Sequence, residues 1–162
     1  MLVEYVATLY YYNSWANARI LHAAENLGNE QFVAPTQIGC GSLRGTLVHI
    51  LSTEWSWRSR WQGKALTTML RDEDFPTLEV LRARWSREER QMQAFLATLS
   101  NEDVQRAVQY HTSHGEKRAA PLWQIMTHVV NHGTQHRSEA AVIESILGYP
   151  PGELDLLEFL HG

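Results

Sequence analysis

Residues 122–147, LWQIMTHVVNHGTQHRSEAAVIESIL, decide the fold because their apolar side chains recur every three or four positions. This spacing is typical of one face of an α-helix. Pro121 precedes the stretch, and proline suits the start of a helix. Gly148 and Pro150 follow it, and both residue types are common where a helix ends. We therefore predict one long helix over residues 122–147.

Three further segments show the same helical spacing: residues 3–27, 43–62 and 78–99. Ser42 and Thr77 stand immediately before two of them, where their hydroxyls suit an N-cap. A short last helix is predicted over residues 153–160. Residues 104–111 and 116–120 are predicted to form a β-hairpin, with His114-Gly115 at its turn.

These elements predict an all-α fold: a four-helix bundle with a short β-hairpin before the fourth helix and a short C-terminal helix. A length of 162 residues suits a single domain over residues 1–162. The long connections between the helices leave their order and handedness open.

The charge balance argues against a nucleic-acid partner, because the formal net charge is −4. The densest basic stretch, residues 82–90, is interrupted by Glu88 and Glu89 and is interpreted as a solvated helix face. The N-terminus has neither the basic start nor the cleavage site of a signal peptide. No apolar run reaches the roughly 18 residues that span a bilayer, so no membrane association is expected.

Cys40 is the only cysteine of the chain, which excludes an internal disulfide and fits a reducing, cytoplasmic location. Cys40 could act as a nucleophile. However, Gly39, Gly41 and Ser42 around it indicate a loop that leads into a helix. A structural or incidental thiol is therefore the favoured interpretation.

The long last helix carries three of the chain's eight histidines, His128, His132 and His136, at successive i, i+4 steps. Imidazoles at this spacing lie on one helix face and can bind a common metal ion. His132 and His136 fall within the apolar stripe of the helix, while His128 lies toward its edge. His132 and His136 are therefore predicted to be ligands, and His128 a neighbour of the site. A surface pair without metal is the alternative, but burying two unpartnered imidazoles would cost roughly 1–3 kcal/mol each.

A third ligand is expected from another helix, and His49 is the residue that offers it. It lies on a helix face made of small residues, which leave room for a metal and a bound molecule: Ser42, Gly45, Thr46, Thr53 and Ser56. A hydrogen-bonded core histidine is the alternative for His49. The remaining histidines have no patterned partners and receive no role: His22, His111, His114 and His161.

Three further polar residues lie close in sequence to the proposed ligands. Glu139 and Gln135 are within a turn of His136, and Glu54 follows His49. A carboxylate that bonds the far nitrogen of an imidazole fixes its tautomer, so these residues are predicted to support the ligands. Glu54 fits equally well as an ordinary helix residue.

Several short motifs follow one another over nearly the whole chain: YNSWAN at 12–17, HIL at 49–51 with Glu54 and Trp55, PLW at 121–123, HVVNHGTQHR at 128–137, GYPPG at 148–152 and DLL at 155–157. In these motifs and their order the chain resembles the DinB/YfiT-like family. One departure is Ser138, where many relatives have glycine, and we expect it to affect packing more than metal binding.

The resemblance implies a four-helix bundle with a long crossover, often dimeric. It also implies a divalent metal, zinc or nickel among others, held by His49, His132 and His136. Some relatives are S-transferases or isomerases that use a low-molecular-weight thiol. A homodimer is expected on the same basis, and exposed tryptophans such as Trp85 would offer a packing face.

Three neutral ligands leave a coordination position open, which is typical of a catalytic site. The favoured function is a metal-dependent thiol S-transferase that acts on a small electrophile. A metal-dependent hydrolase, a non-catalytic metal-binding or sensing module and a purely structural bundle remain alternatives. No catalytic residue is assigned beyond the ligands.

Overall fold

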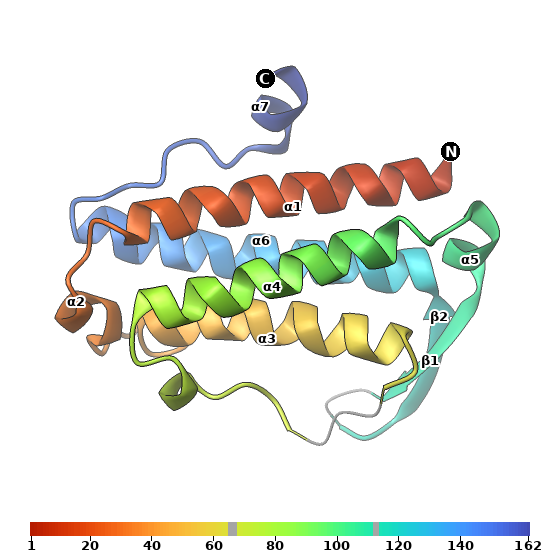
Figure 1. Cartoon of the computed structure of the whole chain (residues 1–162), viewed down its shortest axis with the longest axis horizontal. Helices are drawn as coiled ribbons and strands as arrows, with labels where there is room; N and C mark the ends of the chain where they lie inside the picture. The colour runs from red at the N-terminus through yellow and green to blue at the C-terminus, as the bar shows by residue number, and fades with distance from the viewer. Residues whose placement is uncertain (65–67, 112–113) are drawn as a thin grey trace.

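Four long helices form a bundle, as predicted from the sequence. The computed structural model describes residues 1–64, 68–111 and 114–162. The long helices are α1 (Leu2–Ala24), α3 (Leu43–Trp61), α4 (Leu78–Leu96) and α6 (Leu122–Ile146). Helices α1 and α3 each pack against both α4 and α6 (Figure 1). Helix α1 runs parallel to α6 and α3 parallel to α4, while the two pairs run antiparallel to each other, so a long crossover joins α3 to α4.

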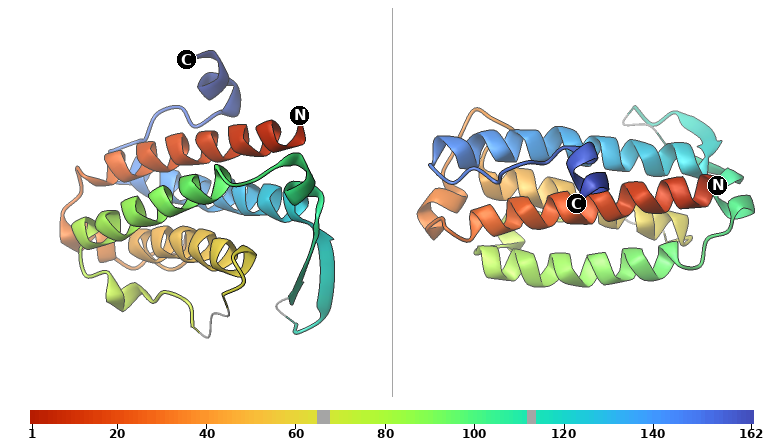
Figure 2. Two further views of the ribbon diagram at one scale, coloured as in Figure 1. Left: turned by 45° about the vertical axis from the view of Figure 1, so that its right-hand side comes forward. Right: turned by 90° about the horizontal axis from the view of Figure 1, so that it is seen from above.

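Six shorter elements connect or follow the long helices: α2 (Asn29–Val33), η1 (Asp72–Asp74), α5 (Asn101–Gln105), β1 (Ala107–His111), β2 (Lys117–Pro121) and α7 (Leu156–His161). The predicted hairpin is confirmed, since β1 and β2 pair antiparallel with Ala107 opposite Pro121. Residues 112–113, between the strands and next to the predicted turn, lie outside the described residues. The predicted C-terminal helix is also confirmed, and α7 lies next to α1 (Figure 2). The ring of Phe159 on α7 packs against that of Tyr12 on α1.

The predicted start of the first strand is wrong, because Val104 lies in helix α5. The reason is a capping box. The Asp103 backbone N–H donates to Ser100 Oγ at 3.2 Å, and the Ser100 backbone N–H donates to the Asp103 carboxylate at 2.9 Å. This reciprocal pair satisfies two backbone donors and favours a helical turn. Val104 is fully buried beneath that turn.

The core has two apolar clusters with buried polar side chains between them. One cluster contains Ile20, Leu47, Leu81 and Ile143, and the other contains Val6, Trp61, Met92 and Met126. The polar side chains buried between them include Asn13, Asn17, Glu54, Arg58, Glu88 and Arg137. Buried polar groups need specific partners, so this middle layer constrains how the four helices align.

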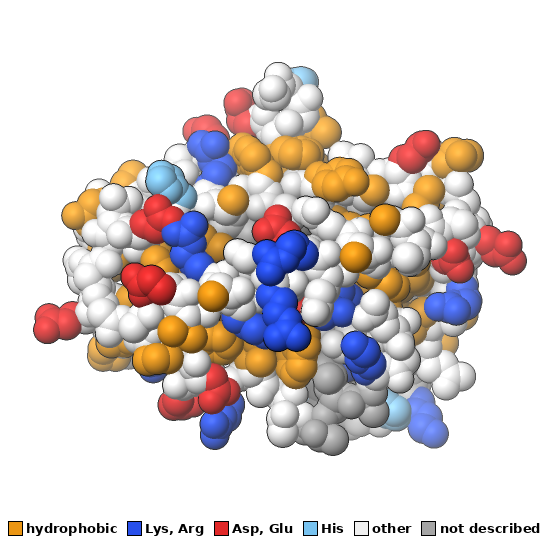
Figure 3. Space-filling model, in the orientation of Figure 1, with side chains coloured by type: hydrophobic (Ala, Val, Ile, Leu, Met, Phe, Trp, Pro, Cys, Tyr) orange, Lys and Arg blue, Asp and Glu red, His pale blue; other side chains and the backbone are white. Residues whose placement is uncertain are grey.

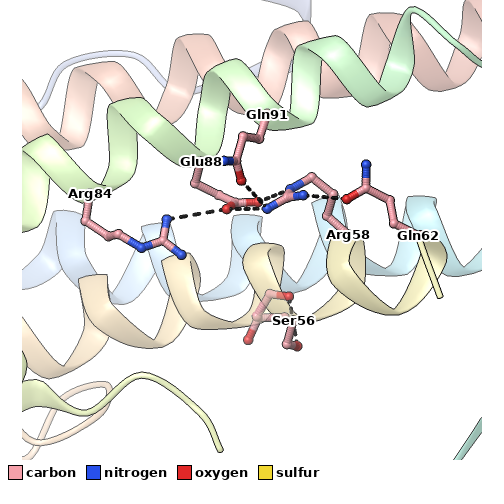
Figure 4. Close-up of polar contacts among 7 residues, drawn as sticks. Ser56, Arg58, Gln62, Arg84, Glu88 and Gln91 are labelled. Carbon is pink, nitrogen blue, oxygen red and sulfur yellow. Dashed lines mark hydrogen bonds and ion pairs between the residues drawn. The ribbon is translucent and has the colours of Figure 1, made fainter. Parts of the chain in front are cut away.

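The interpretation of residues 82–90 as a solvated face is wrong in part, because Glu88 is 1% exposed. Arg58 of α3 holds it through two hydrogen bonds, Nε to Oε1 and Nη2 to Oε2, the second at 2.8 Å (Figure 4). Gln62 and Gln91 accept further hydrogen bonds from the same guanidinium. The exposed basic side chains near α4 are interspersed with acidic and apolar ones (Figure 3).

Trp85 is also buried, at 3% exposure, within the apolar cluster that contains Leu81. The expectation that it offers an exposed packing face for a second chain is therefore wrong. It lies one turn before Glu88, on the face of α4 that points into the bundle. Among the described residues, no helix combines the length and apolar character needed to cross a bilayer.

Candidate metal centre

The structure brings His49, His132 and His136 together in the middle of the bundle, and we call these three residues the histidine cluster. His49 comes from α3, and the other two come from α6. The Nε2 atoms of His49 and His132 lie 3.0 Å apart. The ring centroid of His136 lies 4.4 Å from those of both His49 and His132. All three side chains are partly buried.

The spacing of the cluster fits a divalent transition metal. Two imidazole nitrogens that bind one zinc ion lie about 3.3 Å apart, because each Zn–N bond is about 2.0–2.1 Å long. The Nε2 atoms of His49 and His132 are at 3.0 Å, close to this separation. No lysine or arginine is among the groups that shift the pKa of His49 or of His132, so no cationic side chain is indicated beside these two imidazoles.

Two of these imidazoles are electrically neutral near pH 7. Burial, together with the neighbouring His136 and His49 imidazoles, lowers the pKa of His132 to about 4. Burial and His136 likewise lower the pKa of His49. A neutral imidazole carries a free lone pair on one nitrogen, which is the form that binds a metal.

Glu139 lies on the outer side of His136. Its Oε2 atom is 2.7 Å from Nδ1 of that imidazole, one turn along α6. The carboxylate therefore favours the tautomer with the proton on Nδ1, which leaves Nε2 as the available metal ligand. The side chain of Glu139 is 29% exposed, so the pair lies at the rim of the site.

The other predicted supporting residues lie farther from the cluster. His128 is exposed, with its ring centroid 6.3 Å from that of His132 and 6.5 Å from that of Trp57. Gln135 is exposed on α6. Glu54 is buried, and its Oε1 accepts hydrogen bonds from Asn13 at 2.8 Å and Asn17 at 3.0 Å.

Sequence reasoning missed the role of Arg137 in aligning α6 with α1. This buried side chain donates from Nη1 to Oδ1 of Asn13 at 2.5 Å and of Asn17 at 2.9 Å. Those two asparagines also donate to Glu54, so one polar network joins α1, α3 and α6. Gly133 makes room for it, since a Cβ there would lie 2.8 Å from Arg137 Nη1. The sequence HGTQHR at 132–137 could have indicated this role, because Gly133 directly follows His132 and Arg137 directly follows His136.

A loop before α3 carries Cys40 toward the cluster. Its flanking residues Gly39 and Gly41 have φ values of 60° and 83°, which glycine adopts readily. The Cys40 backbone N–H donates to Thr46 Oγ1 at 3.1 Å. The loop also lies close to α3, because a Cβ on Gly45 would be 2.4 Å from the Cys40 carbonyl oxygen.

This loop brings a thiol to the candidate metal centre, although the sequence favoured a structural or incidental one. Ligand atoms of Cys40, His49 and His136 all lie within 4.8 Å of one another. Burial, with the Glu139 and Asp72 carboxylates, raises the pKa of the Cys40 thiol. The available sequence signal was the pair of glycines that flank Cys40 directly before the small-residue face of α3.

A cavity of about 430 Å³ lies between the hairpin and helices α3 and α6; no member of the histidine cluster lines it, but His128, one turn before His132 on α6, does. Its lining residues are Trp57, Tyr110, His111, Ala120, Gln124, Ile125 and His128. His128 connects the cavity to the cluster through its proximity to His132. A larger cavity of about 680 Å³ lies between α1 and residues 148–151, and no member of the histidine cluster lines it.

The protein is a four-helix bundle in which imidazoles from two antiparallel helices, α3 and α6, meet. It is therefore classed as a helical bundle with a candidate metal centre. The sequence model of the DinB family matches residues 1–162, and the chain belongs to this family. It is similar to Protein DinB of Bacillus subtilis (strain 168), with 24% identity over an alignment 162 positions long, which covers 94% of this chain and 91% of that protein.

Proposed function

We propose that this DinB family member is a metal-dependent enzyme that binds one divalent transition metal, zinc or nickel, through His49, His132 and His136. We further propose that it transfers a low-molecular-weight thiol to a small electrophile. The observation that carries the proposal is the 3.0 Å separation of His49 Nε2 and His132 Nε2, with the His136 ring next to both. Metal binding would replace the direct Nε2–Nε2 hydrogen bond between His49 and His132 with two metal–nitrogen bonds.

A bound metal with a free coordination position would favour the deprotonated, nucleophilic form of a thiol. The chain's own residues position the ligands. Glu139 holds the proton of His136 on Nδ1, so that Nε2 faces the cluster. Arg137 and Glu54 fix α6 against α1 and α3, which keeps His132 and His136 opposite His49.

The electrophile is proposed to bind in the cavity beside the cluster. Trp57 and Tyr110 form an aromatic corner there, with ring centroids 5.8 Å apart, and Ile125 adds an apolar surface. Such walls favour a substrate with an apolar or aromatic part. His128, at the border between cavity and cluster, is placed to contact the reacting end of that substrate.

The test is a turnover assay on the purified full chain, loaded with zinc or nickel. Conjugation of bacterial thiols to a panel of apolar electrophiles is followed, with metal-free protein and His132→Ala as controls. The proposal expects conjugation that requires both the metal and His132. Absence of metal-dependent turnover with every thiol would contradict it.

Two alternatives use the same ligands: a metal-dependent hydrolase and a non-catalytic metal-binding or sensing module. Ester and amide substrates in the same assay separate the hydrolase from the transferase. The ligand-sized cavity beside the cluster favours an enzyme over a sensing module.

The homodimer and the cytoplasmic location stay predictions. With Trp85 buried, the exposed apolar residues Val142 and Ile146 on α6 are the better basis for a dimer surface. Light scattering on Ile146→Glu tests this, since a dimer that uses the surface would dissociate.

A further inference from the structure

We propose that the sulfur of Cys40 is a fourth ligand of the metal ion, beside the histidine cluster. The resting site would then contain a thiolate from the chain itself, in the position that a substrate thiol takes during turnover. This inference rests on the proposed metal binding and adds a ligand that lies outside the three-histidine set.

The Cys40 sulfur lies close enough to the histidine cluster to reach a shared metal ion. Ligand atoms of Cys40, His49 and His136 lie within 4.8 Å of one another, and His132 Nε2 lies 3.0 Å from His49 Nε2. Donor atoms around one tetrahedral zinc ion are about 3.3–3.6 Å apart. A movement on the order of 1 Å, within the reach of a side-chain rotation, would bring the sulfur to this spacing from the ligand atoms of His49 and His136.

The backbone around Cys40 is held against both helices that supply the histidines. The Cys40 N–H donates to Thr46 Oγ1 on α3. On the other side, a Cβ at Gly39 would lie 3.2 Å from Oε2 of Glu139, the carboxylate oxygen that pairs with His136. The loop thus contacts the helix of His49 and the carboxylate partner of His136 at once. These contacts place the sulfur beside the histidines.

The chemistry of the donor set is consistent with this role. Imidazole nitrogen and thiolate sulfur are both ordinary zinc ligands, and cobalt and nickel accept imidazole as well. When the sulfur binds, its proton is released to solvent. When a substrate thiol displaces it, the proton of that thiol passes to the Cys40 sulfur, so the net charge of the site is unchanged. Cys40 is exposed, which gives an incoming thiol access to this exchange.

Cobalt substitution tests the proposal without any activity measurement. The full chain is loaded with Co²⁺ in a buffer free of thiols, and its near-ultraviolet and visible spectrum is recorded. Because Cys40 is the only cysteine, a sulfur-to-cobalt charge-transfer band can come from no other residue. We expect this band in the wild-type protein and in Ser138→Ala. We expect Cys40→Ser to lose it while still binding cobalt through the histidines.

A second measurement uses the wild-type chain alone and does not depend on how the variant folds. A bulky disulfide reagent should modify Cys40 about tenfold or more slowly in zinc-loaded protein than in metal-free protein, because the ion and the imidazoles around it would shield a coordinated sulfur from the reagent.

Cobalt bound at one ion per chain without the charge-transfer band, or equal labelling rates with and without zinc, would overturn the fourth ligand and leave the three-histidine site intact. Failure of the wild-type chain to bind cobalt at all would overturn both proposals together.

Discussion

The Nε2 atoms of His49 and His132 lie 3.0 Å apart, although 83 positions separate the two residues in the sequence. They meet because α3 and α6 run antiparallel with a fixed alignment. A shift of one helical turn along either helix would move one imidazole by about 5.4 Å and separate the pair. The buried hydrogen bonds of Arg137 and Glu54 with Asn13 and Asn17 oppose such a shift.

Replacing His132 with alanine is expected to abolish stoichiometric metal binding, because two imidazoles rarely hold a divalent ion alone. Elemental analysis of the purified protein measures the metal content. His128→Ala is the matched control, since it removes an exposed histidine from the same helix and should retain the metal. Equal metal content in His132→Ala and the wild-type protein would show that the cluster is not the site.

Glu139→Ala is expected to weaken metal binding by about 10–100-fold, the usual effect of removing the carboxylate partner of a histidine ligand. The physical reason is that His136 loses the group that fixes its tautomer and its ring orientation. Competition with a chromophoric chelator measures the affinity. Glu153→Ala, an exposed carboxylate beyond the end of α6, should bind the metal as the wild-type protein does. An unchanged affinity in Glu139→Ala would mean that the contact is incidental.

The long helices were predictable from the sequence because their signals are local. Apolar spacing set their extents, and Ser42 and Thr77 act as N-caps as predicted, accepting hydrogen bonds from the backbone of Gly45 and Val80. The five-residue helices α2 and α5 were missed because they are too short to show an apolar period, although the Ser100 and Asp103 capping box was a local signal for α5.

The errors within the bundle have a different origin, because they concern pairs of residues far apart in the sequence. Glu88 was interpreted as solvated because its partner Arg58 is 30 positions away, on another helix. The three histidines could be proposed from spacing and from the family resemblance. The position of Cys40 could not, because it depends on where two glycines with positive φ turn the preceding loop.

Arg58→Met is expected to destabilise the fold by about 3 kcal/mol, because it leaves the buried Glu88 carboxylate with only the longer, 3.4 Å contact of Arg84. The double variant Arg58→Met/Glu88→Leu should recover most of this loss, since it removes the poorly paired buried charge as well. Urea unfolding of the three proteins gives the comparison. As a control, Arg71→Met breaks an exposed ion pair with Asp74 and should change stability little. Equal destabilisation in the single and double variants would assign the effect to lost packing instead.

Glu144 is expected to make the fold less stable as the pH rises. Its side chain is fully buried on α6, and neither carboxyl oxygen has a hydrogen-bond partner among the described residues. Burial raises the pKa of this carboxyl to about 9 from an ordinary value of 4.5. The native protein therefore holds a proton that the unfolded chain releases above its own pKa. The stability contributed by that proton is complete below pH 4.5 and is lost progressively as the pH rises toward 9.

Glu144→Gln removes the titrating group while keeping its shape, so it should flatten this part of the pH dependence. At pH 8 the variant should be more stable than the wild-type protein by on the order of 5 kcal/mol, and the difference should shrink toward zero near pH 4.5. Urea unfolding at several pH values between these limits measures it. Other titrating groups are shared by both proteins and cancel in the difference, and Glu153→Gln, which changes an exposed carboxylate, should follow the wild-type curve. Parallel curves for Glu144→Gln and the wild-type protein would mean that Glu144 is ionised in the folded state, in contact with a cation or solvent.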